Sequence, residues 1–202
     1  MTASTADPAS SSRTNQRRLL LACLTVCLLS AGCSSNPATG GKDLTQGHAL
    51  DGGMQSTGRA GTENAQLGEV FWAALPLPSN TSRDPLTISK ARFTTIPKGL
   101  KVSEYKVFDV NEVGGVIYLA YSGGKYGTRN PEKYRDHSSE PLKVKGRTSS
   151  HYYYAAKVTV TGPVKTDLEG CRYWYEQKGR EYRQDVPCQT TIRLGPPLTE
   201  DN

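Results

Sequence analysis

Cysteine is the residue type in this 202-residue chain whose chemistry depends most on its surroundings, and the chain has five. A thiolate is a strong nucleophile that takes an acyl or alkyl group, or forms a disulfide with a second thiol. Cys23 and Cys27 lie inside an apolar run, whereas Cys33 directly follows the small residues Ser30 to Gly32. The segments around these cysteines therefore decide which chemistry each one undergoes.

The apolar run LLLACLTVCLLSA at residues 19–31 is too short to span a bilayer. Its thirteen residues cover about 20 Å as a helix, whereas a spanning helix must cross about 30 Å of hydrocarbon. Arg13, Arg17 and Arg18 precede the run, against a single Asp7. A basic segment, a short apolar run and small residues are typical of an export signal, so we expect residues 1–32 to be a signal peptide.

The stretch Leu29-Ser30-Ala31-Gly32-Cys33 resembles the lipobox of bacterial lipoproteins, a leucine and small residues followed by a cysteine. The resemblance covers only the first 33 residues. It implies that the thiol of Cys33 is diacylated, that cleavage falls between Gly32 and Cys33, and that the mature protein is anchored in the cell membrane and faces outside the cytoplasm.

Three questions about export and location stay open in this region. Small residues before a cleavage site are also found in ordinary secretory signals, for which Cys33 would have no role. The segment Gln16-Arg17-Arg18 is similar to a twin-arginine signal, so both the general and the twin-arginine routes are compatible with the sequence. Ser34 leaves open which membrane holds the protein in a cell that has two.

Charge limits the class of partner. Removing the three Arg and one Asp of residues 1–32 from the 25 basic and 19 acidic residues leaves a net charge of +4. This mild surplus suits a protein beside anionic lipid head groups or wall polymers, and it lacks the concentrated basic stripe of a nucleic-acid binder. We expect the membrane, through lipid on Cys33, and an envelope protein or an anionic wall polymer as partners, and no nucleic acid.

Composition divides the mature chain into a tether and one domain. Residues 33–66 contain almost no large apolar side chains, so they cannot bury enough surface to offset the entropy of ordering, and we predict a lipidated cysteine followed by a flexible Gly- and Ser-rich tether. Residues 67–198 are the size of one small domain, followed by a tail at 199–202.

The domain has the short alternating runs and turn residues that are typical of strands. We predict strands near residues 69–77, 85–93, 100–110, 115–122, 151–161, 170–177 and 181–194, with a β-bulge after Ser89, where the alternation changes face. Seven strands in about 130 residues predict an all-β fold, a single immunoglobulin-like β-sandwich.

The last two strands predict a disulfide. With Gly179 and Arg180 at the centre of a type II′ turn, Cys171 faces Cys188, the two cysteines left for pairing in an oxidising compartment. Pro187 has no N–H for the ladder and predicts a local bulge or a sheet edge at that point. The same register places a polar set on the solvent face: Arg172, Trp174, Glu176, Glu181, Arg183 and Asp185.

The connection over residues 123–150 is the candidate binding segment, because long loops in compact domains are often functional. Its seven basic and three acidic residues leave a surplus of four positive charges. Charge-assisted hydrogen bonds to an anionic partner would come from this segment. The candidate ligand-binding residues are Lys125, Tyr126, Arg129, Lys133, Tyr134 and Arg135. The alternative is a solvated loop without a ligand.

Sequence motifs for catalysis are missing. Ser122 lacks the glycine two residues before it that a nucleophile elbow needs, and His48, His137 and His151 lack the spacing of metal ligands. We therefore expect no catalytic residue, metal or cofactor, and a non-catalytic binding or accessory module at the envelope. The alternatives are a structural wall-interaction protein that uses the 123–150 loop, and an enzyme whose site is assembled from distant strands.

Replacing Cys33 by alanine tests the lipid anchor. We expect Cys33→Ala to abolish membrane attachment, because an apolar run of about 20 Å cannot serve as a stable span. Cell fractionation measures this. A variant that is cleaved and still remains with membranes after a high-salt wash would contradict the lipid-anchor hypothesis.

Overall fold

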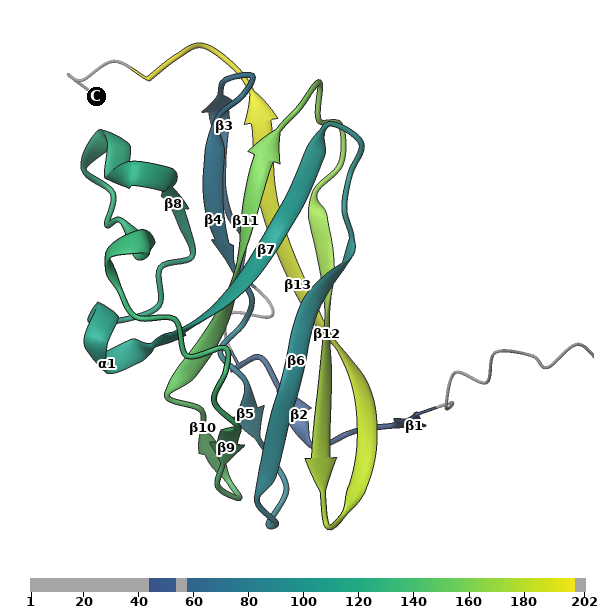
Figure 1. Cartoon of the computed structure of the whole chain (residues 1–202). Coiled ribbons are helices and arrows are strands. Elements are labelled where there is room, and N and C mark those ends of the chain that lie inside the picture. The colour runs from purple at the N-terminus through teal and green to yellow at the C-terminus, as the bar shows by residue number, and fades with distance from the viewer. Residues whose placement is uncertain (1–43, 54–57, 199–202) are drawn as a thin grey trace, which may run out of the picture. The chain divides into compact units, whose positions relative to one another are not determined.

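The computed structural model describes residues 44–53 and 58–198, which form an all-β domain (Figure 1). This confirms the predicted fold class at that level. The predicted signal peptide, Cys33, the beginning of the predicted tether and the tail at 199–202 lie outside the described residues.

The elements follow one another along the chain with short connections. They are β1 (Thr45–Gln46), β2 (Leu50–Asp51), β3 (Ala60–Ala65), β4 (Val70–Ala74), β5 (Ser79–Asn80), β6 (Leu86–Thr95), β7 (Leu100–Asp109), α1 (Val110–Val113), β8 (Leu119–Tyr121), the 3₁₀ segments η2 (Ser122–Gly127) and η3 (Pro131–Lys133), β9 (Leu142–Val144), β10 (Thr148–Ser149), β11 (Tyr152–Val160), β12 (Leu168–Gln177) and β13 (Arg180–Leu194).

Two sheets share the core. The large sheet has the order β1-β13-β12-β6-β9, with β3 also paired to β13, and the four-stranded sheet has the order β7-β11-β4-β8. A third, small sheet joins β10, β5 and β2. Buried side chains from the two larger sheets form one cluster, which includes Phe71 and Tyr154 on one side and Phe93 and Tyr173 on the other.

The folded domain begins before Leu67, the boundary that composition predicted. Strand β3 pairs in parallel with β13 over Thr190 to Leu194, and β1 and β2 pair with β13 and β5. The short strand β2 is held partly through a side chain, since the amide of Gln184 accepts a hydrogen bond from the N–H of Leu50 and donates one to its carbonyl. Composition did not predict β1, β2 and β3 because these strands contain few large apolar residues, and the strands they pair with supply most of the buried surface.

The β-bulge predicted after Ser89 is present. In the pairing of β6 with β12, Lys90 lies opposite Trp174 but Ile88 lies opposite Tyr175, so Ser89 is the extra residue. The bulge explains why Ile88 and Ala91 both face the core.

The four-stranded sheet is buried on both faces. Along β11, Tyr154 and Ala156 belong to the main core, whereas Tyr153 and Ala155 belong to a second cluster with Trp72 and others. The second cluster is completed by residues of α1 and of the segment that follows it. In Figure 1, α1 and the 3₁₀ segments lie beside this sheet, on the side away from β12 and β13.

The predicted register of the last hairpin was wrong by two residues. The turn is formed by Lys178 and Gly179, both with positive φ (52° and 70°), which is the requirement of a type I′ turn. Tyr175 therefore pairs with Tyr182. A shift of two residues keeps every side chain on its original face of the strand, so the predicted division into a buried and a solvent face holds.

The predicted disulfide between Cys171 and Cys188 is present, with its Cα atoms 5.7 Å apart. It does not join directly opposed residues, because Cys171 pairs with Val186. The bridge forms through a change of register in β12 and β13, where Gly170 lies between the pairs Glu169–Gln189 and Cys171–Val186.

This change of register lies where Pro187 predicted a bulge. Two residues of β13, Pro187 and Cys188, are accommodated opposite Gly170. Gly170 has a φ of 65°, and a Cβ added there would lie 2.2 Å from the hydroxyl of Thr94. Only glycine fits this position without displacing its neighbour.

The disulfide predicts a measurable stability difference. In natively exported protein, Cys171 and Cys188 should resist alkylation until a reductant is added. Reduction should lower the free energy of unfolding by about 3 kcal/mol, the amount expected for a closed loop of this length. Mass spectrometry after alkylation and urea unfolding measure the two effects. Two freely alkylated thiols in unreduced protein would contradict the bridge.

Candidate functional site

The 123–150 segment, predicted as the binding loop, is anchored to the domain at several points. Strand β9 pairs with β6 and β10 with β5. Asp136 accepts a hydrogen bond from the N–H of Val107 on β7 (3.1 Å), and the N–H of His137 donates to the carbonyl of Val107 (2.9 Å). The segment is therefore attached to all three sheets, and its strand β9 forms the edge of the large sheet beside β6.

Two of the predicted ligand-binding cations have partners within the domain. The guanidinium of Arg129 donates to the carbonyls of Val113 and Gly114 at the end of α1, both at 2.8 Å. Arg135 forms an ion pair with Glu140 at 2.5 Å. Both side chains help to position the segment.

Of the other four predicted residues, some pack on the domain and some are exposed. Tyr134 packs against the second core cluster. Tyr126 is 42% exposed and lies edge-on to Tyr121, with ring centroids 4.8 Å apart. Lys125 and Lys133 are exposed. The six residues thus contact different parts of the domain; Arg129 and Arg135 are exposed as well but have partners, whereas no ion pair within the described residues involves Lys125 or Lys133.

His137 attaches this segment to α1. Its side chain is almost fully buried, with its two ring nitrogens 3.2 Å from Glu112 and 3.3 Å from Glu140. Its ring also contacts Tyr152, with centroids 5.1 Å apart. Burial alone lowers the pKa of His137, but the hydrogen bonds to the two carboxylates outweigh it and raise the pKa above its ordinary value.

A basic face lies on the solvent side of the large sheet. We define it by Lys90 and Arg92 on β6, Arg172 and Trp174 on β12, and Arg183 on β13. Strand pairing sets these residues side by side in two rows: Arg92 is opposite Arg172, and Trp174 is flanked by Lys90 and Arg183. Sequence reasoning placed Arg172, Trp174 and Arg183 on this side but missed the contribution of β6, because the strand order cannot be deduced from the sequence.

Trp174 holds two of these cations. The ammonium of Lys90 lies 5.2 Å and the guanidinium of Arg92 5.0 Å from the centre of its ring. Such cation–π contacts restrain long side chains without neutralising their charge. The ring thus keeps two positive charges close together and accessible to an anion.

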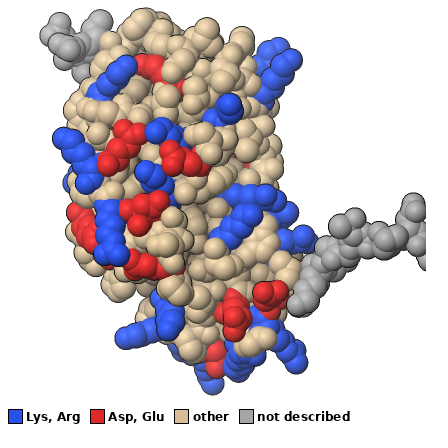
Figure 2. All heavy atoms as spheres, viewed as in Figure 1, with Lys and Arg blue, Asp and Glu red and all other residues tan. Residues whose placement is uncertain are grey.

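One carboxylate partly balances the basic face. Asp185 accepts two hydrogen bonds from Arg172, at 2.6 and 2.7 Å, and this pairing lowers the pKa of Asp185. Four cations and one carboxylate leave a net charge of +3, bounded by Glu176 and Glu181 in the next row. Figure 2 shows basic side chains gathered over β6 and its neighbours, whereas basic and acidic side chains are mixed over α1 and the 3₁₀ segments.

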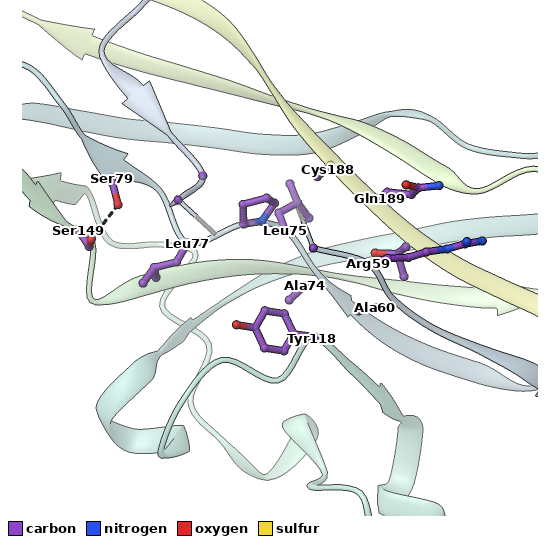
Figure 3. A pocket seen from close by; sticks show the side chains of 15 residues that line it. Arg59, Ala60, Ala74, Leu75, Leu77, Ser79, Tyr118, Ser149, Cys188 and Gln189 are labelled. Atoms are coloured by element: carbon purple, nitrogen blue, oxygen red, sulfur yellow. Dashed lines mark hydrogen bonds between the residues drawn. The ribbon is translucent and has the colours of Figure 1, made fainter. Parts of the chain in front are cut away.

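A separate pocket of about 380 Å³ is lined by residues at the start of β3, the end of β4 and the middle of β13. Its wall includes Leu75, Leu77, Tyr118 and Cys188 (Figure 3). Arg59 contributes its aliphatic part, because its guanidinium is directed to Thr191 and Asp167. The volume is within the range of small-molecule sites, and the wall is predominantly apolar.

Within residues 44–53 and 58–198, no cluster of three or more His, Cys, Asp or Glu side chains could hold a metal ion. None of the helices found in that part of the chain is long and apolar enough to cross a membrane.

Comparisons with known proteins provide little further information. The sequence matches no protein-family model and no curated protein. One similar solved structure is described as "Structure of Vibrio cholerae VesB protease"; the match has 13% identity, covers 71% of this chain and 32% of that chain, and has a TM-score of 0.29. A TM-score this low does not establish a shared fold, and nothing about the function of this chain follows from it.

The raised pKa of His137 predicts a pH dependence of stability. The group contributes stability fully below its ordinary pKa of 6.5, and this contribution is lost as the pH rises through the higher folded-state pKa. We expect the stability advantage of the wild type over His137→Gln to shrink between about pH 6 and pH 8, the region in which histidine titrates. Urea unfolding of both proteins across this range measures the difference. Parallel stability curves would show that the two carboxylates do not retain the proton on His137.

Proposed function

We propose that this protein is a bacterial lipoprotein, anchored outside the cytoplasm through lipid on Cys33, whose domain is a non-catalytic binding or accessory module of the cell envelope. The lipobox-like sequence and the export signal support the location. Two sheets that share one core, with seven strands of at least five residues in the described part, support an immunoglobulin-like sandwich as the architecture.

The basic face is the observation that best supports a binding role. Four cations around Trp174 have only Asp185 as an opposing charge among their direct partners across β6, β12 and β13. A like-charged cluster of this kind raises the free energy of the folded state slightly and gains from a bound anion. Because the backbone positions of these residues are fixed on paired strands, the basic face is better preorganised for binding than the same types of side chain on a loop.

A second candidate surface is the 123–150 segment, acting on an anionic wall polymer. The exposure of Lys125 and Lys133 supports it. Arg129 and Arg135 contribute less, because their guanidinium groups are already paired within the domain. The two surfaces carry similar exposed charges, so they can be compared by matched substitutions.

An envelope-binding experiment separates the two surfaces. The mature chain with Cys33→Ser, which lacks lipid, should sediment with an isolated envelope fraction, and less so as salt shortens the screening length from about 10 Å at 0.1 M to about 3 Å at 1 M. Lys90→Ser with Arg92→Ser should weaken sedimentation several-fold. The matched control, Lys125→Ser with Lys133→Ser, removes the same charge and should have little effect.

Each alternative outcome has a defined meaning. Loss of binding in the control variant alone would assign the role to the 123–150 segment. Binding that is indifferent to salt and to both variants would contradict an anion-binding module. Equal unfolding midpoints for the three proteins would show that the differences do not come from stability, since exposed substitutions usually change it by less than about 0.5 kcal/mol.

A further inference from the structure

The chain enters the domain beside the basic face. Strand β1 pairs in parallel with β13, where Gln46 is the partner of Arg183, and the N–H of Gly47 donates to the carbonyl of Arg183 (2.8 Å). Leu44 and Trp174 line the same shallow depression. The polypeptide that comes from the N-terminal side therefore reaches the domain at the edge of this surface.

The length of chain before this point limits where the surface can be. Ten residues lie between Cys33 and Leu44, and the eleven Cα-to-Cα steps that join the two span at most about 40 Å when fully extended. A lipid on Cys33 would thus keep the basic face within this distance of the lipid head groups. Binding to those head groups would then be intramolecular, at a high effective concentration.

The chemistry of the face matches an anionic bilayer. The face is part of a sheet, so its cations lie near one surface, with neighbouring strands about 4.8 Å apart and alternate residues of one strand about 6.6 Å apart. Basic residues beside a membrane attract anionic head groups when they come within about a Debye length, and each changes binding by about fivefold. Lys90 and Arg92 are exposed, and Arg172 and Arg183 are partly exposed.

We propose that the basic face docks the domain onto anionic phospholipid head groups of the membrane that holds its own lipid anchor. This inference rests on the proposed function, since it specifies the partner of the same surface. The lipid would retain the protein in the membrane, and the face would set the orientation of the domain on it. The 3₁₀ segments η2 and η3, which lie beside the four-stranded sheet (Figure 1), would then face away from the head groups, whereas β9 pairs with β6 at the edge of the basic face.

Vesicle binding tests the docking without the lipid. The mature chain with Cys33→Ser should sediment with vesicles made of equal parts phosphatidylglycerol and phosphatidylcholine, and not with vesicles of phosphatidylcholine alone. Lys90→Ser with Arg92→Ser should reduce partitioning onto the anionic vesicles by about 25-fold, at about fivefold for each cation removed. Lys125→Ser with Lys133→Ser is the matched control and should partition as the parent does.

A parallel measurement with membrane-free cell walls distinguishes this inference from the proposed function. Salt-sensitive binding to walls through Lys90 and Arg92, without binding to anionic vesicles, would overturn membrane docking and leave an anion-binding module. Binding to neither would overturn both. Equal losses in the two double variants would show that vesicle binding depends on total charge and would overturn the assignment to this face.

Discussion

Burial of the four-stranded sheet on both faces constrains the rest of the domain. Its strands carry Trp72, Phe108 and Tyr153 on the side away from the main core, and these side chains must be covered. The covering comes from α1 and the segment that follows it, through Val113 and Tyr134 among others. A connection that would otherwise be a solvated loop must therefore adopt a defined structure, and its charged residues fasten it in place.

This requirement explains how charges are distributed over the two sides of the molecule. On the covered side, Lys157 lies 2.8 Å from Glu132 and within 5.4 Å of the centre of the Trp72 ring, so its charge joins the covering segment to the sheet. On the large sheet, nothing in the described part of the chain covers Trp174 in the same way, and the cations beside it remain accessible. A tryptophan next to a cation thus occurs on both sides of the domain. On the four-stranded sheet the pair is covered by the segment after α1, and on the large sheet it is accessible to solvent.

The sequence predicted where the main strands lie better than it predicted which residues and strands pair with one another. Alternation located the main strands and the bulge at Ser89, because period-two burial depends only on local residues. The hairpin register was missed because both Lys178-Gly179 and Gly179-Arg180 are acceptable turn centres, and the strand pairing decides between them. The alternation predicts one strand over residues 115–122, whereas only Leu119–Tyr121 is strand; the short helix α1, capped by Asp109 and Gly114, comes just before this region.

The candidate site was predicted less well than the fold, for a physical reason. A run of charges in one loop is visible in the sequence, but the carbonyls that bind Arg129 are brought near only by folding, and the pairing of Arg135 with Glu140 of the same loop depends on the shape that the loop adopts. The basic face combines β6 with β12 and β13, which lie about 80 residues away in the chain. Such surfaces depend on strand order, and that order is a property of the complete core.

The short parallel strands at the start of the domain have a mechanical consequence. Tension applied through the chain before Leu44 acts first on β1, which is held by two residue pairs, and then on β2, which is held by two more. These would detach well before β6, β12 and the disulfide bear load. Detaching the sixteen residues from Leu44 to Arg59 would lengthen the connection by as much as about 55 Å. The domain would thus yield to a pulling force with the loss of only Ala49 and Leu50 from the described main core cluster.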